Sequence, residues 1–164
     1  VEGSGSTFTL RLPRAAMREA IQSFDTIDQM LAPRYQQRLV HYIEDNETNV
    51  EIMRGIVAQR PQVTLQVSMN GLDGLAAVRR HRPDLILLDM HLPDIAGLEL
   101  LRHLKRDDNV ADVPVIVVSA DATPAHVEEA LTLGAAHYVT KPVDMVQFMH
   151  MLDDTLADMD TRWG

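Results

Sequence analysis

The stretch Pro83-Asp84-Leu85-Ile86-Leu87-Leu88-Asp89-Met90-His91-Leu92-Pro93-Asp94-Ile95-Ala96-Gly97 decides the fold. Its four consecutive apolar residues, 85–88, are typical of a strand that is buried on both faces of a parallel sheet. Asp89 ends this run, and an ionised carboxylate at the end of such a strand would cost several kcal/mol if it were left dry and unpaired. We therefore expect Asp89 at the carboxyl edge of the sheet, beside a cation, where open α/β sheets bind ligands.

Similar apolar runs recur along the chain and alternate with segments of helical spacing. The predicted strands are 38–43, 64–68, 84–89, 113–118 and 136–140. Apolar residues between them recur at helical intervals, and Asp144 is a suitable N-cap for a last helix with one apolar face. Five strands alternating with five helices predict an α/β fold, (βα)5, in which a doubly wound five-stranded parallel sheet carries helices on both faces.

Composition narrows the class of protein. The chain has 164 residues, of which 46% are hydrophobic and 24% charged, which is typical of one globular domain with an appendage. It has no cysteine, so disulfides and thiolate metal sites are excluded. A formal net charge of −9 argues against nucleic acid as a partner. No apolar run approaches the roughly 20 residues of a membrane span, so we expect a cytoplasmic domain without direct membrane contact.

Chemically useful side chains follow four of the predicted strands. They are Glu44 and Asp45, Asp89, Ser119, and Lys141. Because the carboxyl ends of parallel strands meet at one edge of the sheet, we expect them to converge there. The acids can bind Mg²⁺, which prefers oxygen ligands, while Lys141 would offset charge on a phosphoryl group. Asp89 would be the nucleophile, since a carboxylate can form an acyl phosphate, and Ser119 would donate a hydrogen bond to it.

These pieces resemble a known family over residues 37–158. The matching motifs are Ile43-Glu44-Asp45-Asn46, Leu87-Leu88-Asp89-Met90-His91-Leu92-Pro93, Val117-Val118-Ser119-Ala120 and Tyr138-Val139-Thr140-Lys141-Pro142. In this order and spacing they look like a response-regulator receiver domain of two-component phosphorelay signalling. The resemblance implies a flavodoxin-like fold and a phosphoacceptor, Asp89, that takes its phosphoryl group from a phosphohistidine.

The resemblance also implies a cofactor and its ligands. Asp45 and Asp89 would ligate Mg²⁺ directly, together with the backbone carbonyl of His91, while Glu44 would act mostly through water. Mn²⁺ is expected to substitute for Mg²⁺.

Further roles follow from the same resemblance. The bond between Lys141 and Pro142 is expected to be cis, which places the ammonium in the site. Ser119 and Tyr138 correspond to the switch pair of the family, in which the hydroxyl moves toward the phosphoryl group and the ring turns inward.

The chain departs from the usual family pattern at Glu44, which replaces the commoner aspartate. Met90 and His91 follow the acceptor, and Asp121 lies two residues beyond Ser119. In the family, side chains at the positions of His91 and Asp121 tune the access of water to the acyl phosphate. We therefore expect these residues to set part of the rate of self-dephosphorylation.

The first residues carry a second resemblance. Residues 1–13 are similar to the last glycine box and final strand of a histidine-kinase ATP-binding domain. The similarity lies mainly in the segment from Gly3-Ser4-Gly5-Ser6 to Pro13. We interpret residues 14–36 as a linker that could form a helix, and residues 159–164 as a C-terminal tail. The chain thus looks like the C-terminal piece of a hybrid sensor histidine kinase anchored at the inner face of the cell membrane. Without a kinase core, this piece is not expected to phosphorylate other proteins.

The expected partners are the phosphoacceptor helices of the parent kinase and a histidine phosphotransfer protein. Two other functions are left open. The first is a degenerate receiver that acts as an interaction scaffold, and the observation that favours it is Glu44 in place of the commoner aspartate. An aspartyl-phosphate hydrolase of the haloacid-dehalogenase kind would need an aspartate as general acid two residues after the nucleophile, where this chain has His91.

Overall fold

The computed structural model describes the backbone of residues 37–163 and the side chains of residues 37–158. The predicted kinase-domain segment 1–13 and linker 14–36 lie outside the described residues. Between residues 37 and 163, no helix combines the length and apolarity that crossing a membrane requires.

Five parallel strands form one sheet in the order β2-β1-β3-β4-β5. The strands are β1 (Arg38–Ile43), β2 (Val63–Ser68), β3 (Leu85–Leu88), β4 (Val115–Ser119) and β5 (His137–Thr140). The helices are α2 (Glu47–Val57), α3 (Gly71–Arg80), α4 (Gly97–Arg106), α5 (Pro124–Thr132) and α6 (Met145–Trp163). The strand order reverses direction beside β1 and β3, which places a topological switch point between the two strands that end in acids. The predicted doubly wound α/β fold is confirmed.

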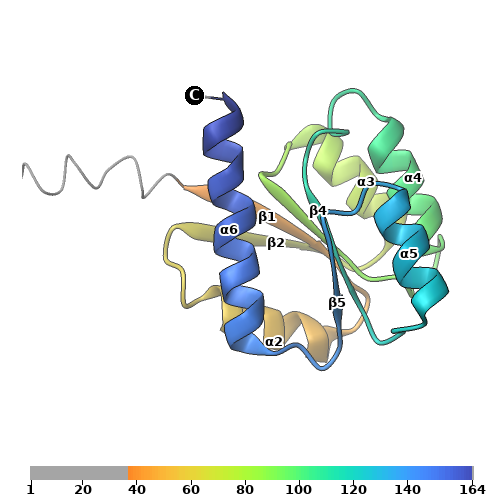
Figure 1. Ribbon diagram of the computed structural model, residues 1–164, viewed down its shortest axis with the longest axis horizontal. Helices are drawn as coiled ribbons and strands as arrows, with labels where there is room; N and C mark the ends of the chain where they lie inside the picture. Colours follow the sequence, from red (N-terminus) through yellow and green to blue (C-terminus); the bar gives the residue numbers. More distant parts are fainter. Residues whose placement is uncertain (1–36, 164) are drawn as a thin grey trace, which may run out of the picture. The chain divides into compact units, whose positions relative to one another are not determined.

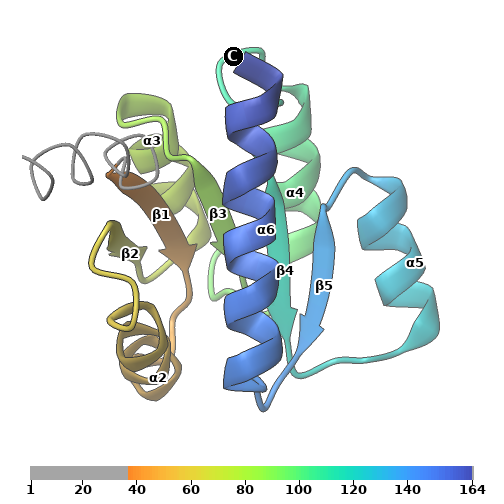
Figure 2. The same cartoon turned by 60° about the vertical axis from the view of Figure 1, so that its left-hand side comes forward.

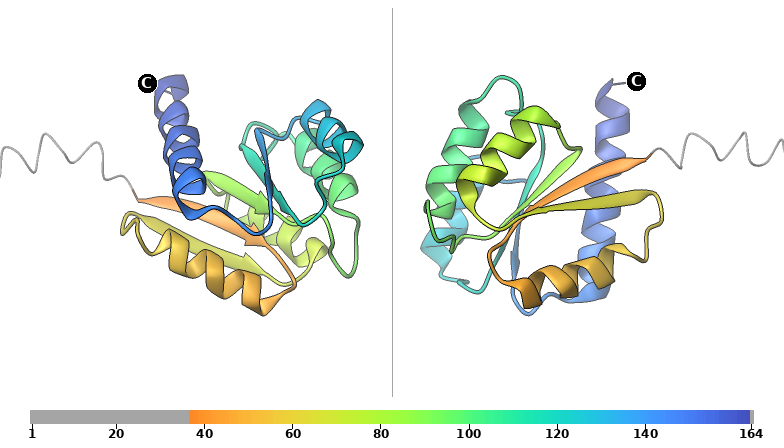
Figure 3. Two further views of the ribbon diagram at one scale, coloured as in Figure 1. Left: turned by 60° about the horizontal axis from the view of Figure 1, so that its bottom comes forward. Right: turned by 180° about the vertical axis from the view of Figure 1, so that it is seen from behind.

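Helices cover both faces of the sheet (Figures 1 and 2). On one face, α2 and α6 pack over strand side chains that include Tyr42, Leu85 and Val118. On the other face, α3, α4 and α5 cover a second cluster that includes Ile43, Leu88 and Val117 (Figure 3). All four residues of β3 are fully buried, as a central strand with helices on both sides requires.

The strand limits differ slightly from those we predicted. β4 was expected at 113–118 but runs from Val115 to Ser119. Pro114 has no N–H to give to the ladder, and only its carbonyl takes part, accepting from Ile86 N at 3.0 Å. Ser119 therefore belongs to the strand itself and pairs with Thr140 of β5. The last helix continues to Trp163, beyond residue 158 where we placed the end of the domain.

Side-chain caps fix the starts of helices that follow the functional strands. Asn46 caps α2 directly after the acidic pair, because its Oδ1 accepts from the backbone N–H groups of Thr48 and Asn49. Asp144 accepts from Gln147 N at 2.9 Å, which confirms its predicted role as the cap of α6. These caps set where the loops after β1 and β5 turn away from the sheet edge.

Candidate functional site

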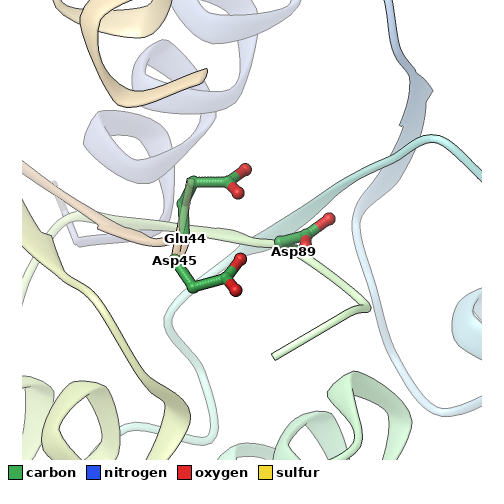
Figure 4. A group of neighbouring side chains, drawn as sticks. All are labelled: Glu44, Asp45 and Asp89. Carbon is green, nitrogen blue, oxygen red and sulfur yellow. The ribbon is translucent and has the colours of Figure 1, made fainter. Parts of the chain in front are cut away.

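Three carboxylates meet at the carboxyl edge of the sheet. Glu44 and Asp45 follow β1, and Asp89 follows the neighbouring strand β3, with Ile43 and Leu88 paired just before them. One oxygen from each of the three lies within 4.8 Å of the others. Figure 4 shows the carboxylate of Asp45 directed toward Asp89. Glu44 and Asp89 are buried, with 1% and 4% of their surface exposed, while Asp45 is exposed to solvent.

Lys141 brings the opposing charge from the end of β5. Its Nζ donates to Glu44 Oε2 at 2.6 Å and to Asp89 Oδ1 at 3.0 Å. The Lys141–Pro142 peptide bond is cis, as the family resemblance implied. One ammonium among three acids leaves the group net negative, and hard carboxylate oxygens in this number suit Mg²⁺. The residues present therefore fit the divalent cation that the sequence predicted.

The two buried acids have opposite pKa shifts. Burial raises the pKa of Asp89, and the neighbouring charge of Glu44 adds to that, which together outweigh the ammonium of Lys141. Burial also acts to raise the pKa of Glu44, but hydrogen bonds from Lys141 and Tyr42 hold it below its usual range. The surroundings therefore favour the ionised form of Glu44 and disfavour that of Asp89, which a cation beside Asp89 would favour.

The loop after β3 holds Asp89 in place through backbone contacts. Asp89 N donates to Ile43 O at 3.0 Å, and His91 N donates to Asp89 Oδ2 at 3.2 Å. At the other end of the loop, Gly97 N donates to Met90 O at 3.1 Å. A Cβ on Gly97 would lie 2.5 Å from Met90 Cα, so α4 can begin this close to Asp89 only with glycine there.

The two hydroxyl side chains of the expected switch pair attach to one residue. Ser119 is fully buried, and its Oγ accepts from Asp121 N at 3.1 Å. The hydroxyl of Tyr138 donates to the backbone carbonyl of Asp121 at 2.5 Å. Both hydroxyls are therefore hydrogen-bonded to the loop between β4 and α5, and a shift of that loop would change the contacts of Ser119 and Tyr138 together.

The expected tuning residues line one small cleft. Its volume is about 110 Å³, and its lining includes Met90, His91, Asp121, His126 and Tyr138. The carboxylate of Asp121 is engaged within its own loop, because Oδ2 lies 2.6 Å from His126 Nδ1 and Oδ1 accepts from Thr123. These contacts, with Thr123 first, hold the pKa of Asp121 well below its usual range.

Three contacts of the site were not predicted from the sequence. Tyr42 donates from its hydroxyl to Glu44 Oε2 at 2.6 Å, and His126 engages Asp121. Asp94 accepts from Gly71 N and Leu72 N, both at 2.8 Å, and so ties the loop after β3 to the start of α3. The alternation of β1 places Tyr42 and Glu44 on the same face, which was the available signal for the first contact.

Comparison with known proteins identifies the family. Residues 40–153 match the family model described as "Response regulator receiver domain". The chain belongs to this family, and it is therefore a receiver domain of two-component signalling.

Two sequence relatives and two solved structures illustrate the match. The polar-differentiation response regulator DivK of Brucella anthropi is 37% identical over 119 residues, covering 73% of this chain and 96% of that protein. DivK of Brucella ovis is 34% identical with the same coverage. The receiver domain of sensor histidine kinase PA1611 from Pseudomonas aeruginosa PAO1, solved with magnesium in its active site cleft, has a TM-score of 0.67 and 23% identity, covering 73% of this chain and 98% of that one. The phosphorylated cyanobacterial phytochrome response regulator RcpA has a TM-score of 0.64 and 25% identity, covering 72% and 90%.

Proposed function

We propose that this receiver domain accepts a phosphoryl group on Asp89 from a phosphohistidine. The observation that carries the proposal is the contact of one ammonium, Lys141 Nζ, with both Asp89 and Glu44 at the carboxyl edge of the sheet. A carboxylate oxygen of Asp89 attacks phosphorus, the phosphorus–nitrogen bond breaks, and the electron pair leaves with the imidazole of the donor. The product is an acyl phosphate on Asp89.

The side chains around Asp89 are proposed to offset the negative charge of the transferred phosphoryl group, directly or through a bound cation. Lys141 offsets negative charge on the phosphoryl oxygens and keeps the acceptor oriented. Asp45, Asp89 and the backbone carbonyl of His91 would hold Mg²⁺, with Glu44 acting through water. When bound, the cation neutralises phosphoryl oxygens and favours the ionised form of Asp89. Mn²⁺ offers the same oxygen preference and is proposed as a substitute.

Ser119 and Tyr138 are proposed to report the phosphorylation. The Ser119 hydroxyl moves to donate to the new phosphoryl group. Because Ser119 Oγ accepts from Asp121 N, this movement also shifts the loop to which the Tyr138 hydroxyl is hydrogen-bonded. Met90, His91 and Asp121 surround the cleft beside the acceptor and are proposed to set the access of water, and with it the rate of self-dephosphorylation.

The test is the intact mass of the full chain after incubation with acetyl phosphate and Mg²⁺. We expect the mass of one phosphoryl group to be added, no addition with EDTA, and none in Asp89→Asn. The matched control is Asp108→Asn, which changes an exposed carboxylate after α4 and should leave the reaction unaltered. Folded wild-type protein that gains no mass from acetyl phosphate or from a phosphorylated histidine kinase would contradict the proposal and favour a scaffold.

The origin and partners of the domain are a second part of the proposal. The resemblance of residues 1–13 to the end of a histidine-kinase ATP-binding domain supports an origin in a cytoplasmic part of a hybrid sensor kinase. The donors would then be the phosphoacceptor helices of that kinase, and a histidine phosphotransfer protein would receive the phosphoryl group. The coding sequence upstream of Val1 tests the origin: an ATP-binding domain there supports it, and its absence refutes it.

A further inference from the structure

Tyr42 is a polar residue in the interior of β1 with a defined partner. Its side chain is 1% exposed and packs in the cluster between the sheet and helices α2 and α6. A buried tyrosine hydroxyl needs a hydrogen-bond partner, and this one donates to Glu44 Oε2 at 2.6 Å. Burial, and then the contact with Glu44, raises the pKa of Tyr42.

The carboxylate of Glu44 accepts three hydrogen bonds from donors of the protein. Its Oε2 accepts from both the Tyr42 hydroxyl and Lys141 Nζ, each at 2.6 Å, and its Oε1 accepts from Asn46 N at 3.1 Å. Only 1% of Glu44 is exposed. This carboxylate is thus fixed from the core side by Tyr42 and presents its charge to Lys141, while the exposed Asp45 faces the solvent side of the acid group.

We propose that Tyr42 is a positioning residue for phosphoryl transfer: its hydroxyl fixes Glu44, and Glu44 in turn holds the ammonium of Lys141 beside Asp89. The assignment rests on the proposed function of Asp89 as phosphoacceptor. Lys141 is the group that faces the incoming phosphoryl oxygens, so an error in its placement lowers the rate of the chemical step. Binding of Mg²⁺ depends mainly on Asp45 and Asp89 and should be little affected.

The length of the Glu44 side chain gives the proposal a specific test. Glu44→Asp withdraws the carboxylate by one C–C bond, about 1.5 Å, which is enough to break the contact with the Tyr42 hydroxyl. Tyr42→Phe removes the same contact from the other side and keeps the ring in the core. If Tyr42 acts through Glu44, its hydroxyl matters only when Glu44 has its full length.

The experiment measures the initial rate of phosphorylation by acetyl phosphate over a range of Mg²⁺ concentrations, using the full chain. In the reaction a carboxylate oxygen of Asp89 attacks phosphorus, the bond from phosphorus to the acetate oxygen breaks, and acetate leaves. Wild type, Tyr42→Phe, Glu44→Asp and the double variant are compared by intact mass. Circular dichroism and urea unfolding establish that each is folded at the assay temperature.

We expect Tyr42→Phe to lower the maximal rate about three- to tenfold, because the lost hydrogen bond acts on the reacting groups only in part, through Glu44 and Lys141. The Mg²⁺ concentration at half-maximal rate should stay within about twofold of wild type, and Tyr42→Phe should have no further effect in the Glu44→Asp background.

Three results would overturn the inference. These are an unchanged maximal rate in Tyr42→Phe, an equal loss with and without Glu44→Asp, or a loss that saturating Mg²⁺ restores. A role of Tyr42 confined to core packing predicts the second of these. Failure of wild type to accept the phosphoryl group would instead refute the proposed function itself, and the two failures are therefore distinguishable.

Discussion

The substitution Gly97→Ala tests whether the close start of α4 positions the acceptor. A Cβ at this position would lie 2.5 Å from Met90 Cα and 2.8 Å from the carbonyl oxygen of Asp89. Ordinary contacts begin at 3.4 Å, so the loop after β3 must move by roughly 0.9 Å, the difference between 3.4 and 2.5 Å. These two atoms belong to the backbone and cannot simply rotate aside, unlike Met90 Sδ, which would lie 2.6 Å away.

The expected cost follows from this overlap. Overpacking of a tight contact costs about 1–3 kcal/mol, and the better helix propensity of alanine returns at most about 1 kcal/mol. We expect the free energy of unfolding of Gly97→Ala to fall by about 1–2 kcal/mol. The same displacement would disturb the 3.0 Å contact between Asp89 Oδ1 and Lys141 Nζ, and so lower the rate of phosphorylation.

Gly55→Ala is the matched control. Gly55 is an exposed residue within α2, and a Cβ there would meet nothing within 4 Å. This change should therefore raise the free energy of unfolding by up to about 1 kcal/mol through helix propensity alone, with the phosphorylation rate unaltered. Urea unfolding followed by circular dichroism gives the stabilities, and intact mass gives the rates. Gly97→Ala protein as stable and as quickly phosphorylated as wild type would refute the reasoning.

Three other changes have expected outcomes. Asp94→Ala removes the acceptor for the N–H groups of Gly71 and Leu72, so urea unfolding should show a loss of about 1 kcal/mol; an unchanged midpoint would mean that the cap contributes nothing. Burial lowers the pKa of His41, so as the pH falls below about 6.5 the unfolded chain gains the proton before the folded chain does. The free energy of unfolding then decreases as the pH decreases, by up to about 1.4 kcal/mol per pH unit. His41→Gln should lose that slope between pH 7 and 5, and identical slopes would exclude His41 as its source. Mg²⁺ at ten times its dissociation constant should stabilise the protein by about 1.4 kcal/mol, reversibly with EDTA; thermal unfolding of Asp45→Asn that still shows the full shift would exclude Asp45 as a ligand.

The sequence was most informative where a physical pattern repeats. Four apolar residues before Asp89 are enough to predict a central parallel strand, and parallel strands place the residues that follow them at one edge. That reasoning gathered Glu44, Asp45, Asp89 and Lys141 correctly, and the structure brings them into one group. Strand limits were less accurate, since the start of β4 depends on which peptide groups find partners on β3.

Contacts between side chains that are distant in sequence, or that depend on one rotamer, were not predictable. Asp94 accepts hydrogen bonds from the first residues of α3, which lie more than twenty positions before it, and no local sequence pattern predicts that contact. Tyr42 has the appearance of an ordinary core residue of a strand. Its role becomes visible only when the orientation of its hydroxyl toward Glu44 is known.

The central claim is that Asp89 is the residue that carries the phosphoryl group. Its most direct test is reduction of the acetyl phosphate-treated chain with borohydride, which converts an acyl phosphate to an alcohol, followed by peptide mass spectrometry. The account predicts homoserine at position 89 alone, formed only when Mg²⁺ was present during phosphorylation. Homoserine at another aspartate, or at no position in a chain that has gained the mass of a phosphoryl group, would contradict it.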